Sequence, residues 1–156
     1  MPRRVPTLVV GWREWVALPE LGVAAVRAKL DSGARSSSLH VADVEPIERD
    51  GARWVRFRVR VDEREPGREA VSEAPVVGER RIRSSSGHVE PRLVVRTTLV
   101  LGPWRGAIDL TLTRRDSLGH RMLLGRRALR GRCLVDPSRS YVAGRPGHRR
   151  KNAKSR

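Results

Sequence analysis

Residues 26–39 read VRAKLDSGARSSSL, and this stretch decides the fold prediction for the 156-residue chain. Residues 26–30 alternate apolar and basic side chains, which is the period-two pattern of a half-buried strand. That strand runs directly into Asp31, which is followed by a serine and a glycine. On local pattern alone the simpler interpretation is a tight turn, with Asp31 bonding its own backbone and Gly33 supplying a positive φ angle.

The rest of the chain contains motifs that resemble those of a known protein family. An apolar strand ending in Asp-Ser/Thr-Gly-Ala resembles the active-site signature of aspartic proteases, and residues 122–126, MLLGR, resemble the second retropepsin signature. Further blocks are GWRE at 11–14, LPELG at 18–22, RSSSGH at 83–88, LLGRRAL at 123–129 and LVDPS at 134–138. Together, over residues 8–141, they resemble the bacterial and archaeal retropepsin-like proteins labelled ATP-dependent zinc proteases, whose relatives are associated with ATP-grasp glutamate ligases.

The resemblance implies roles for particular residues. Asp31 would be the catalytic acid. The residues that would support it are Ser32, Gly33, Ala34, Gly125 and Arg126, with Gly125 and Arg126 behind the active-site loop. The flap over a substrate would comprise Ser84, Ser85, Ser86, Gly87 and His88, although an ordinary flexible turn explains that segment equally well.

Peptide hydrolysis by carboxylates requires two of them around one water molecule. Two carboxylates that share a site cannot both ionise easily, so the pair holds one proton between them. The Asp-Ser-Gly-Ala motif occurs once in this sequence, at residues 31–34. We therefore predict a homodimer in which a two-fold axis brings Asp31 of each subunit together. Ser32 would then form a hydrogen bond across that axis.

Composition restricts the partners and the compartment. Lys and Arg total 33 against 17 Asp and Glu, a net charge of +16, which favours nucleic acid, a ribosomal surface or an acidic peptide. The preference for arginine over lysine also looks like a coding bias. Cys133 is the only cysteine, consistent with a reducing cytosol. Without a membrane-length apolar run or a signal peptide, we expect a cytoplasmic protein with no membrane contact.

No motif in the sequence supports the binding of zinc or ATP that the family label names. A zinc-protease helix would show His-Glu-x-x-His, and a phosphate-binding loop would show Gly-x-x-x-x-Gly-Lys-Ser/Thr; neither occurs. The four histidines are scattered, and Cys133 has no close histidine partner. We predict no cofactor and no metal, with a metal site assembled from distant residues left open.

Strand-like segments dominate the remaining sequence. We expect strands near 7–10, 26–31, 39–41, 54–61, 76–78, 80–83, 92–102, 107–113, 121–124 and 134–137, and one helix at 125–130. The segment 62–74 is polar and predicts a loop or mobile hairpin, and 103–106 predicts a hairpin connection. Trp12 and Trp15 would pack in the core or in a dimer interface. The fold prediction is therefore all-β: a small closed or nearly closed retropepsin-like β-barrel with one short C-terminal helix.

The domain prediction is a barrel at 1–141 and a basic, disordered tail at 142–156. The arginines that alternate through 54–61 form either a solvated face or a contact with an acidic partner.

Two functions follow. The first is an aspartic endopeptidase acting as a cytoplasmic homodimer; the association with glutamate ligases implies an acidic or glutamylated protein substrate. The alternative is a non-catalytic barrel that binds ribosome, RNA or acidic proteins through its basic surface and tail, with contacts at Arg145–Arg156.

Overall fold

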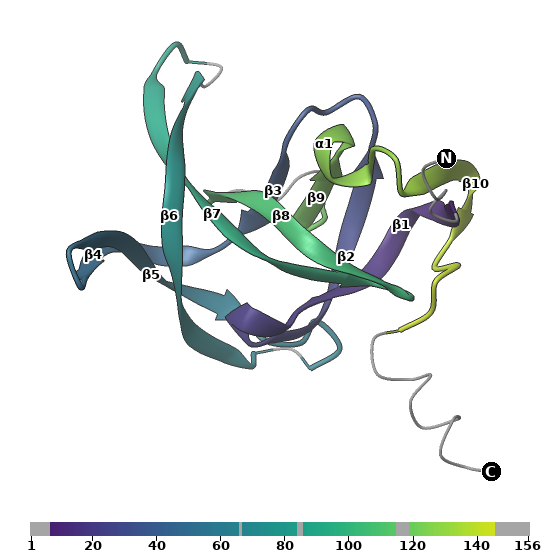
Figure 1. Ribbon diagram of the computed structural model, residues 1–156, viewed down its shortest axis with the longest axis horizontal. Coiled ribbons are helices and arrows are strands. Elements are labelled where there is room, and N and C mark those ends of the chain that lie inside the picture. Colours follow the sequence, from purple (N-terminus) through teal and green to yellow (C-terminus); the bar gives the residue numbers. More distant parts are fainter. Residues whose placement is uncertain (1–6, 66, 84–85, 115–118, 146–156) are drawn as a thin grey trace, which may run out of the picture.

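The computed structural model describes residues 7–65, 67–83, 86–114 and 119–145 and shows an all-β protein (Figure 1). The elements in chain order are β1 (Leu8–Leu18), η1 (Pro19–Leu21), β2 (Val23–Asp31), β3 (Ser37–His40), β4 (Ala42–Arg49), β5 (Ala52–Arg60), β6 (Glu69–Arg83), β7 (Val89–Leu101), β8 (Trp104–Thr113), β9 (Met122–Gly125), α1 (Arg126–Leu129) and β10 (Cys133–Ser140). Here η1 is a short 3₁₀ turn.

The strands close into a barrel. In order around the barrel, β1, β2, β9, β3, β8 and β7 are hydrogen-bonded neighbours, and a pairing of Ala17 in β1 with Val100 in β7 completes the ring. Beyond β7 the sheet continues through β6, β5 and β4, while β10 lies parallel to β1 at the other end. The prediction of a small retropepsin-like barrel with one short helix is confirmed.

The core is built from the inward faces of these strands. In β5, Val55, Phe57 and Val59 are almost completely buried, as the alternation predicts. The arginines between them face outward and are paired within the chain: Arg56 lies 2.9 Å from Glu73 of β6, and Arg58 lies 3.1 Å from Asp43. This face is therefore exposed to solvent, as one of the two interpretations has it, and it also carries ion pairs within the chain. Contact with an external acidic partner stays a prediction.

The same pairing explains one wrong expectation. Residues 69–74 are not a loop, because β6 begins at Glu69 and pairs with β5 in a continuous antiparallel register. Its acidic side chains are the partners of the β5 arginines; besides Arg56–Glu73, Arg58 lies 3.9 Å from Glu69. A polar sequence therefore forms a strand because a complementary strand lies beside it.

Several boundaries also differ from the prediction. The first strand does not stop at Gly11 but runs to Leu18, and the 103–106 hairpin connection is shorter, because Leu101 pairs directly with Trp104. β4 was not expected, β10 extends to Ser140, and the helix is confined to Arg126–Leu129.

The remaining predictions concern residues near the two ends of the chain. Trp12 and Trp15 are half-buried rather than core residues, and Trp15 lies 6.1 Å from Tyr141 between ring centroids. Residues 146–156 lie outside the described residues, so the domain boundary and the disordered tail stay predictions. Among the residues described, no helix is both long and apolar enough to cross a membrane.

Candidate active site

Asp31 is the last residue of β2 and opens a tight turn. Its Oδ1 accepts a hydrogen bond of 2.9 Å from the backbone N–H of Gly33, and its carbonyl oxygen accepts one of 3.1 Å from the N–H of Ala34. A Cβ at position 33 would lie 3.1 Å from that Oδ1, so glycine lets the backbone approach the carboxylate closely. The half-buried carboxylate is thus oriented by its own loop, and its Oδ2 accepts no hydrogen bond from the described residues.

The junction of β9 and α1 supports this loop from behind. Asp31 lies beside Gly125 in the parallel β2–β9 ladder, and the Gly125 N–H donates a 3.1 Å hydrogen bond to Oγ of buried Ser37. A Cβ at position 125 would lie 2.5 Å from the carbonyl oxygen of Ser36. Only glycine therefore allows the two segments to pack at this distance.

Arg126 adds two further contacts to the loop. Its backbone N–H donates a 2.7 Å hydrogen bond to the carbonyl of Ala34, and its Nη1 donates one of 3.2 Å to the carbonyl of Gly33. The next residue repeats the arrangement, since the Arg127 N–H bonds the Arg35 carbonyl at 3.2 Å. The structure therefore brings Gly33, Ala34, Gly125 and Arg126 around Asp31.

The other residues predicted for the site are Ser32 and the segment between β6 and β7. Ser32 is exposed, and its hydroxyl makes no hydrogen bond to the described part of the chain. Ser86, Gly87 and His88 are exposed residues between β6 and β7, whose last register pair joins Arg83 and Val89. Ser84 and Ser85 lie outside the described residues. In Figure 1 this hairpin and the turn after β2 both project toward the upper side of the view.

Metal-binding groups do not assemble in the described residues. No three His, Cys, Asp or Glu side chains there are arranged to hold a metal ion. Cys133 is half-buried in β10, and burial raises the pKa of its thiol. A raised pKa lowers the thiolate fraction, and the thiolate is the reactive form.

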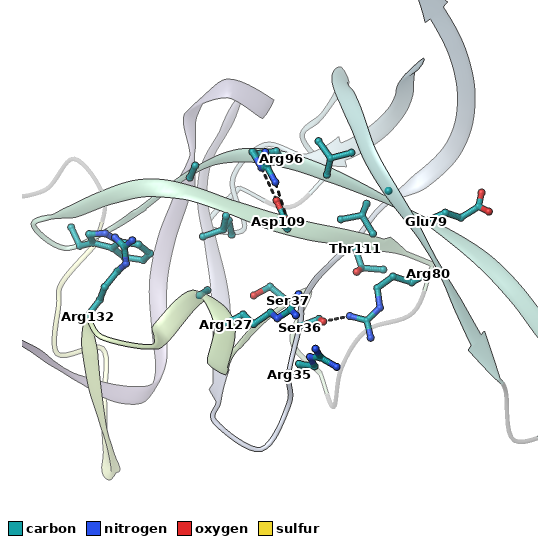
Figure 2. Close-up of a pocket in the computed structure, with 17 residues that line it drawn as sticks. Arg35, Ser36, Ser37, Glu79, Arg80, Arg96, Asp109, Thr111, Arg127 and Arg132 are labelled. Carbon is teal, nitrogen blue, oxygen red and sulfur yellow. Dashed lines mark hydrogen bonds and ion pairs between the residues drawn. The ribbon is translucent and has the colours of Figure 1, made fainter. Parts of the chain in front are cut away.

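Sequence reasoning missed a cleft of about 620 Å³ beside the Asp31 loop (Figure 2). Its charged lining consists of Arg35, Arg80, Arg96, Arg127 and Arg132, together with Glu79 and Asp109. These side chains come from the loop after β2, from β6, β7 and β8, and from the region of α1. The only sequence signal was the overall excess of arginine, which does not say where arginines meet.

Sequence reasoning also missed the role of Glu14, whose side chain is completely buried. Its Oε2 accepts hydrogen bonds from the backbone N–H groups of Gly11, at 2.6 Å, and Val142, at 2.8 Å. Its Oε1 accepts a third from Ala143, at 3.0 Å. This carboxylate is structural, because it holds the residues after β10 against β1.

A closed barrel that displays Asp-Ser-Gly-Ala at a strand end, with Gly-Arg packed behind it, defines a retropepsin-like protein. The family model described as "RimB-like: Retropepsin-like aspartic endopeptidase RimB" matches residues 9–146. The chain belongs to this RimB-like family.

Curated relatives are similar over most of this chain. Three are each named "Probable alpha-L-glutamate ligase". The protein from Parasynechococcus marenigrum is 47% identical over 88% of this chain, that from Shewanella halifaxensis is 43% identical over 87%, and that from Desulfotalea psychrophila is 41% identical over 92%. The matched regions are only 29%, 30% and 31% of those relatives, so the chain spans about a third of their length.

A solved structure shares the fold. The Legionella pneumophila protein Lpg0085, described as having unknown function, superposes with a TM-score of 0.75 at 29% sequence identity. The match covers 88% of this chain and 99% of that one.

Proposed function

We propose that this protein is an aspartic endopeptidase whose active site forms in a cytoplasmic homodimer, with Asp31 of each subunit as the catalytic pair. The observation that carries the proposal is the Asp31 turn. One carboxylate oxygen is held at 2.9 Å by the Gly33 N–H, while the other accepts no hydrogen bond from the described residues. A second carboxyl group and a water molecule can approach that oxygen.

The proposed reaction uses one proton shared by the two carboxyl groups. The ionised Asp31 removes a proton from the water, whose oxygen attacks the carbonyl carbon of the scissile bond. The protonated Asp31 of the other subunit donates its proton to the carbonyl oxygen, giving a tetrahedral diol. Transfer of a proton to the amide nitrogen and cleavage of the C–N bond then release an amine and a carboxylic acid.

An acidic protein is the proposed substrate. The matched relatives are named as glutamate ligases, and this chain resembles about a third of each, so a region like this one occurs within proteins named for glutamate chemistry. The net charge of +16 would accelerate the encounter with a carboxylate-rich chain. The relatives' ligase activity is not proposed for this chain, because the match covers only 29% to 31% of their length.

The test is cleavage of a fluorogenic peptide that contains a glutamate run, followed by mass spectrometry of the products. We expect the unaltered protein to cleave it and Asp31→Asn to abolish cleavage. The matched control is Glu48→Gln, which removes one exposed carboxylate from β4 and should leave the rate unchanged. Light scattering should give twice the mass of one chain.

A strict monomer, or equal rates for Asp31→Asn and the unaltered protein, would contradict the proposal. The competing non-catalytic binding module predicts the reverse pattern. Binding to ribosomes or RNA would then survive Asp31→Asn and disappear when residues 144–156 are deleted.

A further inference from the structure

The cleft beside the Asp31 loop is lined by apolar, polar and charged side chains. Val94, Ile108 and Ala128 line it and are each at least 91% buried. Figure 2 shows Arg35, Arg80 and Arg127 gathered around Ser36 on one wall. The Arg80 Nη1 donates a hydrogen bond to the Ser36 hydroxyl, which joins β6 to the loop that follows Asp31.

The other charges in the cleft are already paired. Arg96 bonds Asp109 at 2.8 Å, and this carboxylate raises the pKa of the Arg96 guanidinium above its usual value. Arg132 lies over the ring of Trp104, 4.8 Å from its centroid. Glu79 points away from the cleft in Figure 2 and lies 3.8 Å from Arg53.

Three guanidinium groups in the cleft therefore remain with neither a carboxylate nor an aromatic ring as a partner. Arg35, Arg80 and Arg127 form no ion pair with any acidic side chain in the described residues. Arg56 and Arg58 of β5, in contrast, are paired with acids of β4 and β6. Because like charges repel, a group of three unpaired cations beside a cleft marks a site for an anion supplied from outside.

We propose that this cleft is a substrate subsite, in which Arg35 and Arg127, assisted by Arg80, bind carboxylate side chains of an acidic polypeptide. The inference rests on the proposed peptidase function and names the residues that determine its specificity. Arginine suits this role because its planar group binds a carboxylate through two parallel N–H donors. The volume of about 620 Å³ lies within the range of ordinary ligand pockets.

The position of the subsite fixes which substrate residues it can bind. Arg35 follows Asp31 by four positions in the sequence, so their Cα atoms lie at most about 14 Å apart. A substrate bound as an extended strand advances about 3.3 Å per residue. The acidic side chains that determine specificity should therefore lie within about four residues of the scissile bond.

Binding can be tested separately from cleavage with the Asp31→Asn protein. Fluorescence anisotropy would measure its affinity for fluorescein-labelled hexaglutamate, hexaglutamine and a single-stranded RNA hexamer at physiological salt. We expect hexaglutamate to bind tightest, and Arg35→Gln with Arg127→Gln to weaken it about tenfold or more.

The matched control is Arg114→Gln with Arg139→Gln, which removes the same charge from two exposed positions outside the cleft. This control should change the affinity less than about twofold, because exposed charges are screened over about 8 Å at physiological salt. Circular dichroism would verify that all variants are folded.

Three binding results would overturn the subsite: equal losses in the two double variants, hexaglutamine binding as well as hexaglutamate, or tighter binding of the RNA. The cleavage assay distinguishes failure of the peptidase proposal from failure of the subsite proposal. If the cleft bound hexaglutamate selectively but the unaltered protein cleaved no acidic peptide, the peptidase would be refuted and the site would not be a substrate subsite.

Discussion

The carboxylate of Glu14 and the backbone N–H of Val142 are hydrogen-bonded at 2.8 Å across a sequence separation of 128 residues. Glu14 also bonds Gly11 and Ala143, so one buried side chain connects β1 to the chain beyond β10. A buried charge is tolerated here because three N–H donors surround it. The barrel's first strand and the chain's C-terminal segment are joined at this point.

Glu14→Ala should therefore destabilise the protein strongly. The substitution leaves three N–H donors near a buried cavity without their acceptor, and each unsatisfied group costs about 1–3 kcal/mol. We expect the free energy of unfolding to fall by about 3 kcal/mol or more, measured by urea denaturation. The control Glu45→Ala removes an exposed carboxylate 3.6 Å from Arg56 and should cost less than about 1 kcal/mol. Equal losses would show that Glu14 does not hold the two segments together.

Gly125→Ala tests the packing behind the Asp31 loop. The added Cβ would lie 2.5 Å from the Ser36 carbonyl oxygen and 2.7 Å from its carbon, and both atoms are backbone. The loop must shift, so we expect a loss of about 1–3 kcal/mol in urea denaturation and loss of peptide cleavage. Gly78→Ala is the stability control, because no atom lies within 4 Å of its added Cβ. An unchanged unfolding midpoint for Gly125→Ala would contradict this account.

Parts of the fold were predictable because one physical pattern governed them. β5 alternates apolar and basic residues, since one face packs in the core and the other faces solvent. The turn at Asp31 was predictable because an Asp side chain bonds the backbone N–H two residues further on. Both features depend only on residues that are near neighbours in the sequence. The positive φ expected at Gly33 was wrong, because the backbone there does not adopt a left-handed conformation and the glycine is needed instead for its close approach to the carboxylate.

Features that depend on distant partners were not predictable. Glu14 is buried in a strand, and its burial makes sense only when Val142 and Ala143 lie beside it. The start of β6 looked like a loop because its acids pair with arginines of another strand. The arginine cleft likewise combines separate segments, so a total charge of +16 could not locate it.

Asp62 gives a prediction about acid stability. Its carboxylate accepts hydrogen bonds from the Arg64 side chain at 2.8 and 2.7 Å and from the Arg64 backbone N–H, and these bonds lower the pKa of Asp62. A lowered pKa in the folded state means that the stabilisation is present above the unfolded value of about 4 and is lost as the pH falls below it. Asp62→Asn should therefore lower the thermal midpoint at pH 7 more than at pH 3. An equal change at both pH values would contradict the role of the ionised carboxylate.

Arg126→Ala separates positioning of the active-site loop from stability of the barrel. The variant keeps the backbone bond to Ala34 and loses only the 3.2 Å bond from Nη1 to the Gly33 carbonyl. Because this guanidinium is exposed, the free energy of unfolding should change by less than about 1 kcal/mol.

Cleavage should respond more strongly than stability, because the Gly33 N–H orients the Asp31 carboxylate. We expect kcat to fall about tenfold with KM nearly unchanged, since small displacements of reacting groups cost rate rather than binding. Arg130→Ala, which removes an exposed arginine at the end of α1, should leave kcat unaltered. Arg126→Lys should restore part of the rate if its ammonium reaches the Gly33 carbonyl. Equal kcat values for Arg126→Ala and Arg130→Ala would show that the guanidinium does not position the loop.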